Sequence, residues 1–188
     1  MYLLTETASP FALERWAAFF ANFGQFAKGF FYTLGISIGA LIVALLLGLI
    51  FGAMSSTHNK VLRGISRVYV EIFQNTPLLV QFVVVFYGIS ILTDGHVMIP
   101  ISLTAILCVG VYTGAYISEI IRTGIEAVPK GQTEAALSQG FTYADTMRII
   151  ILPQAVRTIL PPLTNQVVNL IKNTSTVAII SGADIMFT

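Results

Sequence analysis

Long apolar segments, separated by short polar intervals, dominate this chain. Residues 29–57 contain no charged residue, and about 20 apolar residues are enough for a helix to cross a bilayer. We therefore predict a first spanning helix there. A second uncharged stretch lies between Glu71 and Asp94, and a third apolar run extends from Val97 to Ser118. Because helices satisfy their own backbone hydrogen bonds in lipid, these segments predict an all-α polytopic membrane protein.

A fourth segment, from Met147 to Ile171, is apolar but repeatedly interrupted. The interrupting residues are Pro153, Arg157, Pro161, Pro162, Asn165, Gln166 and Asn169. Polar groups and prolines are tolerated at membrane depth where they are buried in protein or line a wet cavity. We interpret this segment as a broken helix that faces a polar pathway through the membrane. The alternative is a surface segment outside the bilayer.

The first 28 residues differ from the rest of the chain. They lack the basic start and apolar core of a cleaved signal peptide, and their aromatic residues recur at helical spacing, as in a helix that lies in the membrane interface. We expect an outside or interfacial segment at 1–28, followed by a transmembrane domain at 29–188. An N-terminal extension of the first span is an equal alternative.

Basic residues concentrate in two of the intervals between the first, second, third and fourth apolar segments. Residues 58–67 hold the densest basic cluster, and further basic residues flank the polar interval 129–146, whereas the turn at Asp94 has no Lys or Arg. The positive-inside rule then places 58–67 and 122–148 in the cytoplasm, with the Asp94 turn and the N-terminus outside.

Composition agrees with a membrane protein and excludes several other classes. Hydrophobic residues make up 55% of the 188 residues and charged residues 10%, against roughly 25% charged in soluble domains. The net charge of +1 does not indicate nucleic-acid binding. The single cysteine, Cys108, cannot form an intrachain disulfide. No zinc spacing, phosphate-binding loop or nucleophile motif is present, so we expect neither an enzyme nor a bound metal or cofactor.

The polar interval 129–146 has the local chemistry of a short helix followed by a turn. Residues from Glu134 to Ser138 favour helix, and we expect Glu134 in a first turn, where the helix dipole favours an acid. Gly140 is placed to end this helix of about six residues. Thr142 and Asp145 then form a capping-box pattern before the next apolar run.

From this interval to Pro153, the spacing of several residues resembles the cytoplasmic coupling motif of ABC-importer permeases. The motif residues are Glu134, Ala135, Ala136, Gly140, Ile150, Leu152 and Pro153. In that family the short helix docks into a groove on the ATPase subunit and carries its movement to the membrane helices. The resemblance therefore implies ATPase-coupling roles for Glu134, Ala135, Ala136, Leu137 and Gly140. The alternative is an ordinary cytoplasmic loop with a capped helix.

Three further stretches resemble the polar-amino-acid branch of the same family. They are Phe73–Gln81, Tyr112–Arg122 and Lys172–Ser175. The chain departs from the branch at Gln74, where a basic residue is common, and at Thr176, where a large aliphatic residue is usual. Within the first stretch Pro77 lacks a backbone donor, so we expect the carbonyl of Phe73 to be available for another hydrogen bond.

The resemblance implies a type I ABC importer permease of the cell inner membrane, with four visible transmembrane helices of an expected five. We expect that the recorded chain stops before the last helix. The implied partners are cytoplasmic ATPase subunits that hold the ATP and Mg²⁺, a second permease (identical or related), an extracellular substrate-binding protein and the lipid bilayer. The implied substrate is a polar amino acid.

Polar residues in the spans are candidates for the substrate pathway, because ionisable groups at membrane depth are costly without a partner. The candidates are Asn75, Thr76, Gln81, Glu119, Asn165, Asn169 and Lys172. Asn165, Asn169 and Lys172 share one helix face. Glu119 and Arg122 are three residues apart and can form an ion pair, whose favoured role is structural.

Two other function classes stay open from the sequence. A secondary transporter driven by an ion gradient needs membrane-embedded acids for coupling, and only Glu119 is placed for that role. A non-transporting membrane scaffold would leave the polar, proline-rich fourth segment without a purpose.

Overall fold

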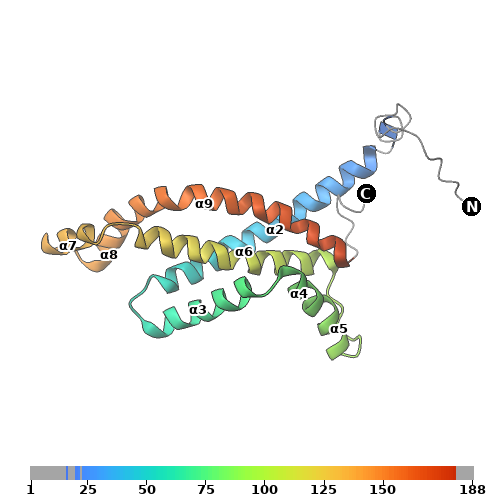
Figure 1. Cartoon of the computed structure of the whole chain (residues 1–188), viewed down its shortest axis with the longest axis horizontal. Helices are drawn as coiled ribbons and strands as arrows, with labels where there is room; N and C mark the ends of the chain where they lie inside the picture. The colour runs from blue at the N-terminus through green and yellow to red at the C-terminus, as the bar shows by residue number, and fades with distance from the viewer. Residues whose placement is uncertain (1–15, 17–19, 22, 181–188) are drawn as a thin grey trace, which may run out of the picture.

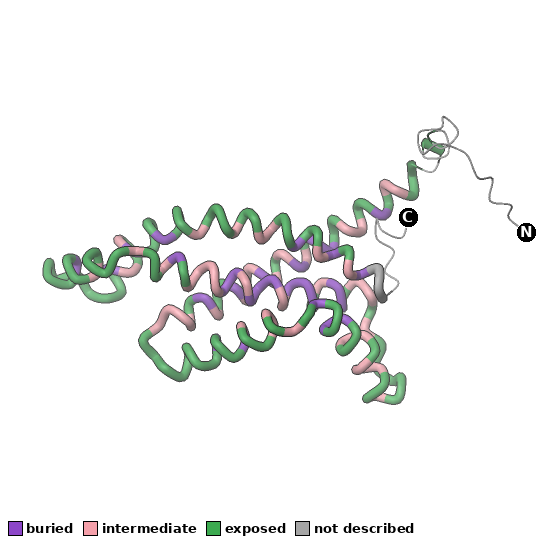
Figure 2. Tube along the Cα trace, in the orientation of Figure 1, coloured by how far each residue is buried: buried purple, intermediate pink, exposed green. Residues whose placement is uncertain are grey.

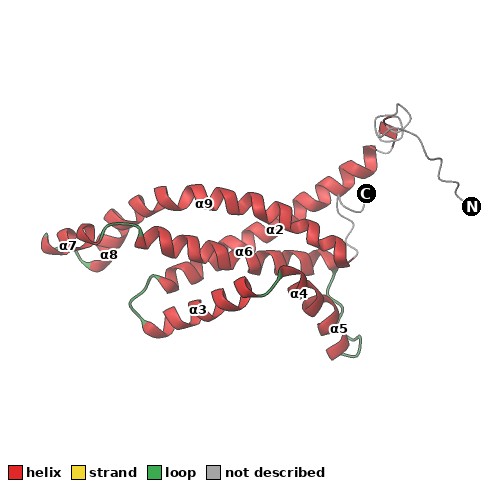
Figure 3. Cartoon of the chain, in the orientation of Figure 1, coloured by secondary structure: helices red, strands yellow, loops and turns green. Residues whose placement is uncertain are grey.

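In the computed structural model of the chain, the described residues are 16, 20, 21 and 23–180, with side chains described as far as Val177. All regular structure within these residues is helical (Figure 3). Most of the predicted interfacial segment at 1–28, and the end of the chain at 181–188, lie outside the described residues.

The described helices follow one another along the chain with short connections (Figure 1). The α-helices are α2 (Phe23–Ser55), α3 (Lys60–Asn75), α4 (Leu78–Val83), α5 (Ile89–Leu92), α6 (Ile101–Glu126), α7 (Lys130–Ser138), α8 (Tyr143–Asp145) and α9 (Leu152–Asn173). Two π-helical segments, η1 (Val84–Gly88) and η2 (Thr146–Ile151), and the 3₁₀ segment η3 (Thr174–Ile180) adjoin them.

Two of the described helices, α2 and α6, are each long and apolar enough to cross a membrane, and α3 with α4–α5 forms a bent pair that can supply a third span. The fourth predicted segment is α9, whose amides and prolines lower its hydropathy. The first span begins at Phe23 instead of Gly29. Residues 23–28 are therefore helical and continuous with the segment predicted to span the membrane, while the domain boundary after residue 28 stays a prediction.

The core lies where α2 packs along α6. In Figure 1, α9 and α3 run along opposite sides of α6, and both contact it. Buried residues concentrate on α6 and on the facing side of α2 (Figure 2). The core cluster includes Ile36, Ala40 and Ala44 from α2, and Val109 and Ile117 from α6.

Small residues allow α2 and α6 to approach closely. A Cβ added at Gly110 would lie 2.8 Å from the Cβ of Val43 and 3.1 Å from the carbonyl oxygen of Ala40. At Gly48, an added Cβ would lie 2.7 Å from the Cβ of Ile117. Lipid tails are as apolar as the side chains, so close packing between small residues drives helix association in a membrane.

The second span is not one helix, contrary to our prediction. α3 ends at Asn75, Pro77 precedes α4, and the two parts are bent by 98°. The prediction for the Phe73 carbonyl is confirmed, because the buried side-chain amide of Gln81 donates to it at 3.2 Å and to the carbonyl of Thr76 at 3.1 Å. Gln81 thus satisfies the backbone groups that the bend exposes.

The fourth segment is also different from our prediction, since α9 is continuous through Pro161 and Pro162. A proline keeps a helical φ and removes one backbone hydrogen bond. The carbonyls left without that bond belong to Arg157 and Thr158, which are exposed, so water or a neighbouring group can satisfy them. The irregular part precedes α9, in the π-helical segment η2.

The close approach of α2 and α6 predicts that Gly110→Ala destabilises the subunit by roughly 1–3 kcal/mol, the usual cost of overpacking. Thermal unfolding in detergent would measure the loss. The matched control is Gly35→Ala on α2, where an added Cβ meets nothing within 4 Å. Equal stability of the two variants would contradict the close packing.

The bend at Pro77 predicts that Gln81→Leu lowers stability by about 1–3 kcal/mol, because buried carbonyls lose their donor. The same unfolding measurement applies, with Leu79→Ala, on the exposed side of α4, as the control. A Gln81→Leu protein as stable as the wild type would show that the amide does not hold the bend.

Candidate functional site

The polar interval 129–146 begins with α7, which is longer than predicted. It has nine residues and starts at Lys130, directly after the extended Pro129. Glu134 therefore lies in the second turn, and the prediction of an acid in the first turn is wrong. Pro129 itself lies outside the helix because its ψ is 133°, and α7 begins at the next residue.

The end of α7 is formed as predicted. Gly140 has a φ of +87°, a left-handed conformation that glycine adopts without strain. The amide of Gly140 donates to the carbonyl of Leu137 at 3.0 Å, and the amide of Phe141 donates to the carbonyl of Ala136 at 3.1 Å. These two bonds make a Schellman motif, which turns the chain sharply at the end of the helix.

The N-cap of the capping pattern after this turn is confirmed, whereas the Asp145 carboxylate accepts from the Thr142 hydroxyl and not from its backbone amide. The Thr142 hydroxyl oxygen accepts the backbone amide of Asp145 at 3.2 Å, and the hydroxyl donates to the Asp145 carboxylate at 2.6 Å. The chain then runs through α8 and η2 into α9. The short helical stretch 143–151, made of α8 and η2, thus connects the turn after α7 to α9.

The motif residues of α7 divide between two faces. Ala136 is buried at 3% exposure, and α7 packs against η2, where Thr146 and Ile151 are buried. In contrast Glu134, Ala135, Leu137 and Gly140 are exposed. One face therefore fixes α7 to its own subunit, while the other presents a carboxylate and an apolar side chain outward.

A second contact holds this loop in place, and sequence reasoning missed it. The ring of His58, in the turn between α2 and α3, meets the ring of Tyr143 edge-on with centroids 4.9 Å apart. The α2–α3 turn and the 129–146 loop thus lie at the same end of the bundle (Figure 1). The two basic intervals that the positive-inside rule assigned to one side are therefore neighbours.

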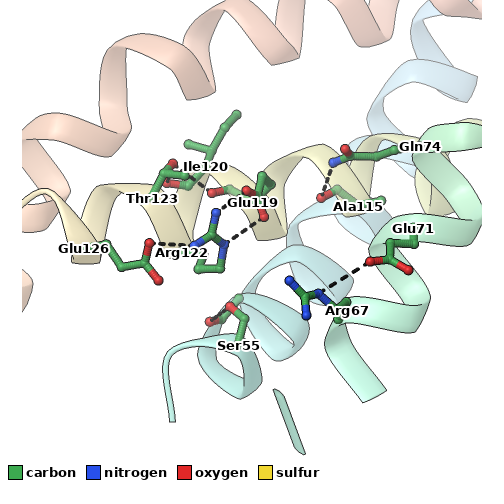
Figure 4. Close-up of polar contacts among 11 residues, drawn as sticks. Ser55, Arg67, Glu71, Gln74, Ala115, Glu119, Ile120, Arg122, Thr123 and Glu126 are labelled. Atoms are coloured by element: carbon green, nitrogen blue, oxygen red, sulfur yellow. Dashed lines mark hydrogen bonds and ion pairs between the residues drawn. The ribbon is translucent and has the colours of Figure 1, made fainter. Parts of the chain in front are cut away.

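The predicted ion pair between Glu119 and Arg122 is present on α6 (Figure 4). The Nε of Arg122 donates to Glu119 at 2.9 Å, and its Nη1 donates to Glu126 at 2.5 Å. Glu126 was missed, although its i,i+4 spacing from Arg122 was a visible signal. One guanidinium therefore joins two carboxylates at the end of α6.

The remaining pathway candidates lie in two separate places. Asn165, Asn169 and Lys172 are exposed along one face of α9, and Asn75 is exposed at the end of α3. The Thr76 hydroxyl donates to its own helix, at the Ile72 carbonyl, and Gln81 is buried in the bend. The structure thus brings the three α9 residues together but does not join them to the bend.

Among the described residues, no group of three or more His, Cys, Asp or Glu side chains is arranged to hold a metal ion.

Comparison with known proteins identifies the family. Residues 44–187 match the family described as "Binding-protein-dependent transport system inner membrane component". The chain is 41% identical to the probable glutamine ABC transporter permease protein GlnM of Bacillus subtilis, across 89% of this chain and 76% of that protein. It is 36% identical to the glutamate/aspartate import permease protein GltJ of Escherichia coli K12, across 86% and 70% of the two chains.

Solved structures agree with this assignment. An amino acid ABC transporter solved with histidines matches with a TM-score of 0.83 and 34% identity, covering 90% of this chain and 78% of that one. The MetNI methionine ABC transporter, at 18% identity and a TM-score of 0.69, shares the fold. This chain therefore belongs to the binding-protein-dependent transport system inner membrane component family, the permease subunits of ABC importers.

Proposed function

We propose that this permease imports a polar amino acid, using ATP hydrolysed by separate cytoplasmic ATPase subunits that hold the nucleotide and Mg²⁺. The observation that carries the proposal is α7, a short helix fixed by Ala136 on one face and exposed on the other. Glu134 and Leu137 on the exposed face are the contacts we assign to the ATPase, with Ala135 and the Gly140 turn beside them.

The substrate class rests on the relatives. The glutamine permease and the glutamate/aspartate permease share more than a third of their aligned residues with this chain. Glutamine, glutamate and aspartate are polar amino acids, which supports the same class here. An extracellular binding protein that delivers the substrate and a second permease, identical or related, complete the proposed assembly.

The pathway assignment rests on the polar face of α9. Lys172, Asn165 and Asn169 are exposed in this subunit, and among the described residues none of their side chains forms an ion pair or a hydrogen bond. Polar groups at membrane depth avoid lipid. We therefore assign this face to a water-filled space between the two permeases. Asn75 and Thr76 are weaker candidates, and the Gln81 amide already donates to backbone carbonyls at the bend.

A secondary transporter driven by an ion gradient is less well supported. Its only candidate coupling acid, Glu119, accepts two hydrogen bonds from Arg122. Both oxygens of this carboxylate are engaged by the guanidinium, which leaves it poorly placed to carry a transported ion. The proposed orientation puts the 129–146 loop in the cytoplasm and the N-terminus outside.

The coupling proposal predicts that Glu134→Lys and Leu137→Asp each reduce co-purification with the ATPase subunit at least about tenfold, equivalent to about 1.4 kcal/mol. Each change removes an exposed contact without altering the buried Ala136. Membrane levels of the permease should be unchanged, and quantitative pull-down in mild detergent would measure association.

The matched control for association is His96→Glu, a charge change at an exposed residue in the turn at the other end of the bundle. It should bind the ATPase as the wild type does. Full association of Glu134→Lys and Leu137→Asp would assign the motif to an ordinary capped loop.

The pathway proposal predicts that Asn165→Ala, Asn169→Ala and Lys172→Ala each slow ATP-dependent uptake roughly 3- to 10-fold, as for a lost hydrogen bond of about 1 kcal/mol. Uptake of labelled amino acid in proteoliposomes containing the whole transporter would measure it. Ile171→Ala, which removes an exposed apolar side chain beside Lys172, should leave uptake unchanged. Unaltered rates in all three alanine variants would exclude this face from the pathway.

A further inference from the structure

The helix α3 has three distinct faces. Its buried face holds Ser66, whose hydroxyl donates to the carbonyl of Phe51 at 2.8 Å, and Tyr69, whose hydroxyl donates to the carbonyl of Val111 at 2.7 Å. These bonds attach α3 to α2 and α6 and set which of its sides face outward. The remaining circumference is exposed, and it divides into an apolar part and a polar part.

The apolar part, which we call the α3 stripe, consists of Val61, Ile65, Val68 and Ile72. These side chains recur at helical spacing and are between 50% and 69% exposed. Lipid tails are as apolar as such side chains, so the stripe can lie against acyl chains without loss. We therefore assign the stripe to contact with lipid.

The polar part of α3 lines a cleft of about 700 Å³, and the end of α6 forms the opposite wall. Arg67 on α3 pairs with Glu71. Arg122 on α6 pairs with both Glu119 and Glu126 (Figure 4). The three carboxylates that line the cleft are thus all held by a guanidinium of the same wall.

Two cations of the cleft have no such partner. Lys60 and Arg63 line it and are exposed, and among the described residues neither side chain forms an ion pair. The first turn of α3 contains no acidic residue that could pair with them. Because four cations and three carboxylates line the cleft, its net charge is +1, and one singly charged anion would neutralise it.

The two unpaired cations lie at the depth of lipid headgroups. The first span ends with α2 at Ser55, and α3 starts at Lys60, so the turn between them lies at the membrane surface. Arg63 follows Lys60 by three residues, which is about 4.5 Å along a helix. The headgroup region is roughly 5–7 Å thick on each side of the hydrocarbon core. Both cations therefore fall within it.

The unpaired cations and the α3 stripe meet along one row of the helix. Lys60, Gly64 and Val68 are spaced four residues apart, so they lie one above another on the same face. A Cβ added at Gly64 would meet nothing within 4 Å, which leaves the space beside Lys60 open. An anionic group held by Lys60 and Arg63 can thus extend an apolar tail directly onto the stripe.

This region is separate from the pathway assigned to α9. The helices α3 and α9 run along opposite sides of α6 (Figure 1), so the cleft does not continue the polar face of α9. On the stripe side the neighbour of α3 is the bilayer itself. The ligand that fits both the charge and the apolar surface is therefore a lipid.

We propose that Lys60 and Arg63 form a binding site for one anionic phospholipid, whose phosphate occupies the start of the α3–α6 cleft and whose acyl chains lie on the α3 stripe. Arginine binds phosphate through two parallel hydrogen bonds, and lysine binds it as a point charge. Basic pockets between membrane helices hold anionic headgroups in this way. The site does not depend on which substrate the subunit transports.

The test uses the complete transporter in mild detergent, titrated with phosphatidylglycerol, and native mass spectrometry to count the bound lipids. We expect the double variant Lys60→Gln/Arg63→Gln to raise the apparent Kd of the most tightly bound lipid at least about tenfold, because the phosphate loses both charged donors. Thermal unfolding without added lipid should match that of the wild type, since both side chains are exposed.

The matched control is the double variant Lys130→Gln/Arg148→Gln. It removes two exposed cations from the same end of the bundle, and neither of them lines the cleft. Its apparent Kd for phosphatidylglycerol should be that of the wild type. An equal loss of binding in the control would overturn the proposal, because the lipid would then follow the general positive charge of this end.

Two further titrations identify the ligand class. Phosphatidylcholine, whose choline cancels the phosphate charge, should bind the wild type at least about tenfold more weakly than phosphatidylglycerol. Glycerol phosphate carries the phosphate without acyl chains and should not displace the lipid at equal concentration. Displacement by glycerol phosphate would overturn the lipid assignment in favour of a soluble phosphate compound. Unchanged phosphatidylglycerol binding in Lys60→Gln/Arg63→Gln would overturn the site itself.

Discussion

Direct contact between α2 and α6 is the constraint on which the other elements depend. In lipid, helices gain little from burying apolar side chains, so their association relies on close packing. Gly110 and Gly114 on α6 lie against the backbone carbonyls of Ala40 and Ala44 on α2, with an added Cβ falling within 3.1–3.3 Å of those oxygens. Since α3 and α9 both pack on α6, a wider α2–α6 spacing would displace every surface proposed here for coupling or transport.

The second constraint is that backbone groups inside the membrane need partners. Pro77 breaks the second span, and the break persists because Gln81 donates to two carbonyls around it. The carbonyl of Gln81 in turn faces the Cys108 thiol on α6, with the sulfur 3.8 Å from the oxygen. The bend is therefore anchored to the same helix as the core. Because its side-chain amide donates to two carbonyls, Gln81 can be buried in an apolar subunit.

The coupling loop is connected to the bundle by contacts of a different kind. Ala136 packs on η2, the Schellman turn ends α7, and Thr142 starts the path that continues into α9. The edge contact between His58 and Tyr143 adds a link to the α2–α3 turn. These contacts thus connect the coupling loop both to α9, which carries the proposed pathway residues, and to the turn before α3. Irregular π-helical turns such as η2 are frequent at functional sites.

The sequence by itself determined those features that depend on local chemistry or on hydropathy. The Gly140 turn, the Thr142 cap, the Glu119–Arg122 pair and the free carbonyl of Phe73 all follow from residues within a few positions of one another. The membrane class and the family followed from apolar length and motif spacing. Local rules misplaced the start of α7, because the helix begins at Lys130, beside Pro129 and before the run of strong helix formers from Glu134 to Ser138.

Only the tertiary structure decided which helices touch and which polar faces remain exposed. A proline at 77 and a proline pair at 161 and 162 gave similar signals, yet the first accompanies a 98° bend and the second lies inside a continuous helix. The difference lies in what satisfies the backbone carbonyls that lack a helical hydrogen bond. At the bend, the Gln81 amide donates to them, whereas in α9 these carbonyls belong to exposed residues. The contact of Gly110 with Val43, and that of the Cys108 thiol with the Gln81 carbonyl, join residues too distant in sequence for any local pattern to pair them.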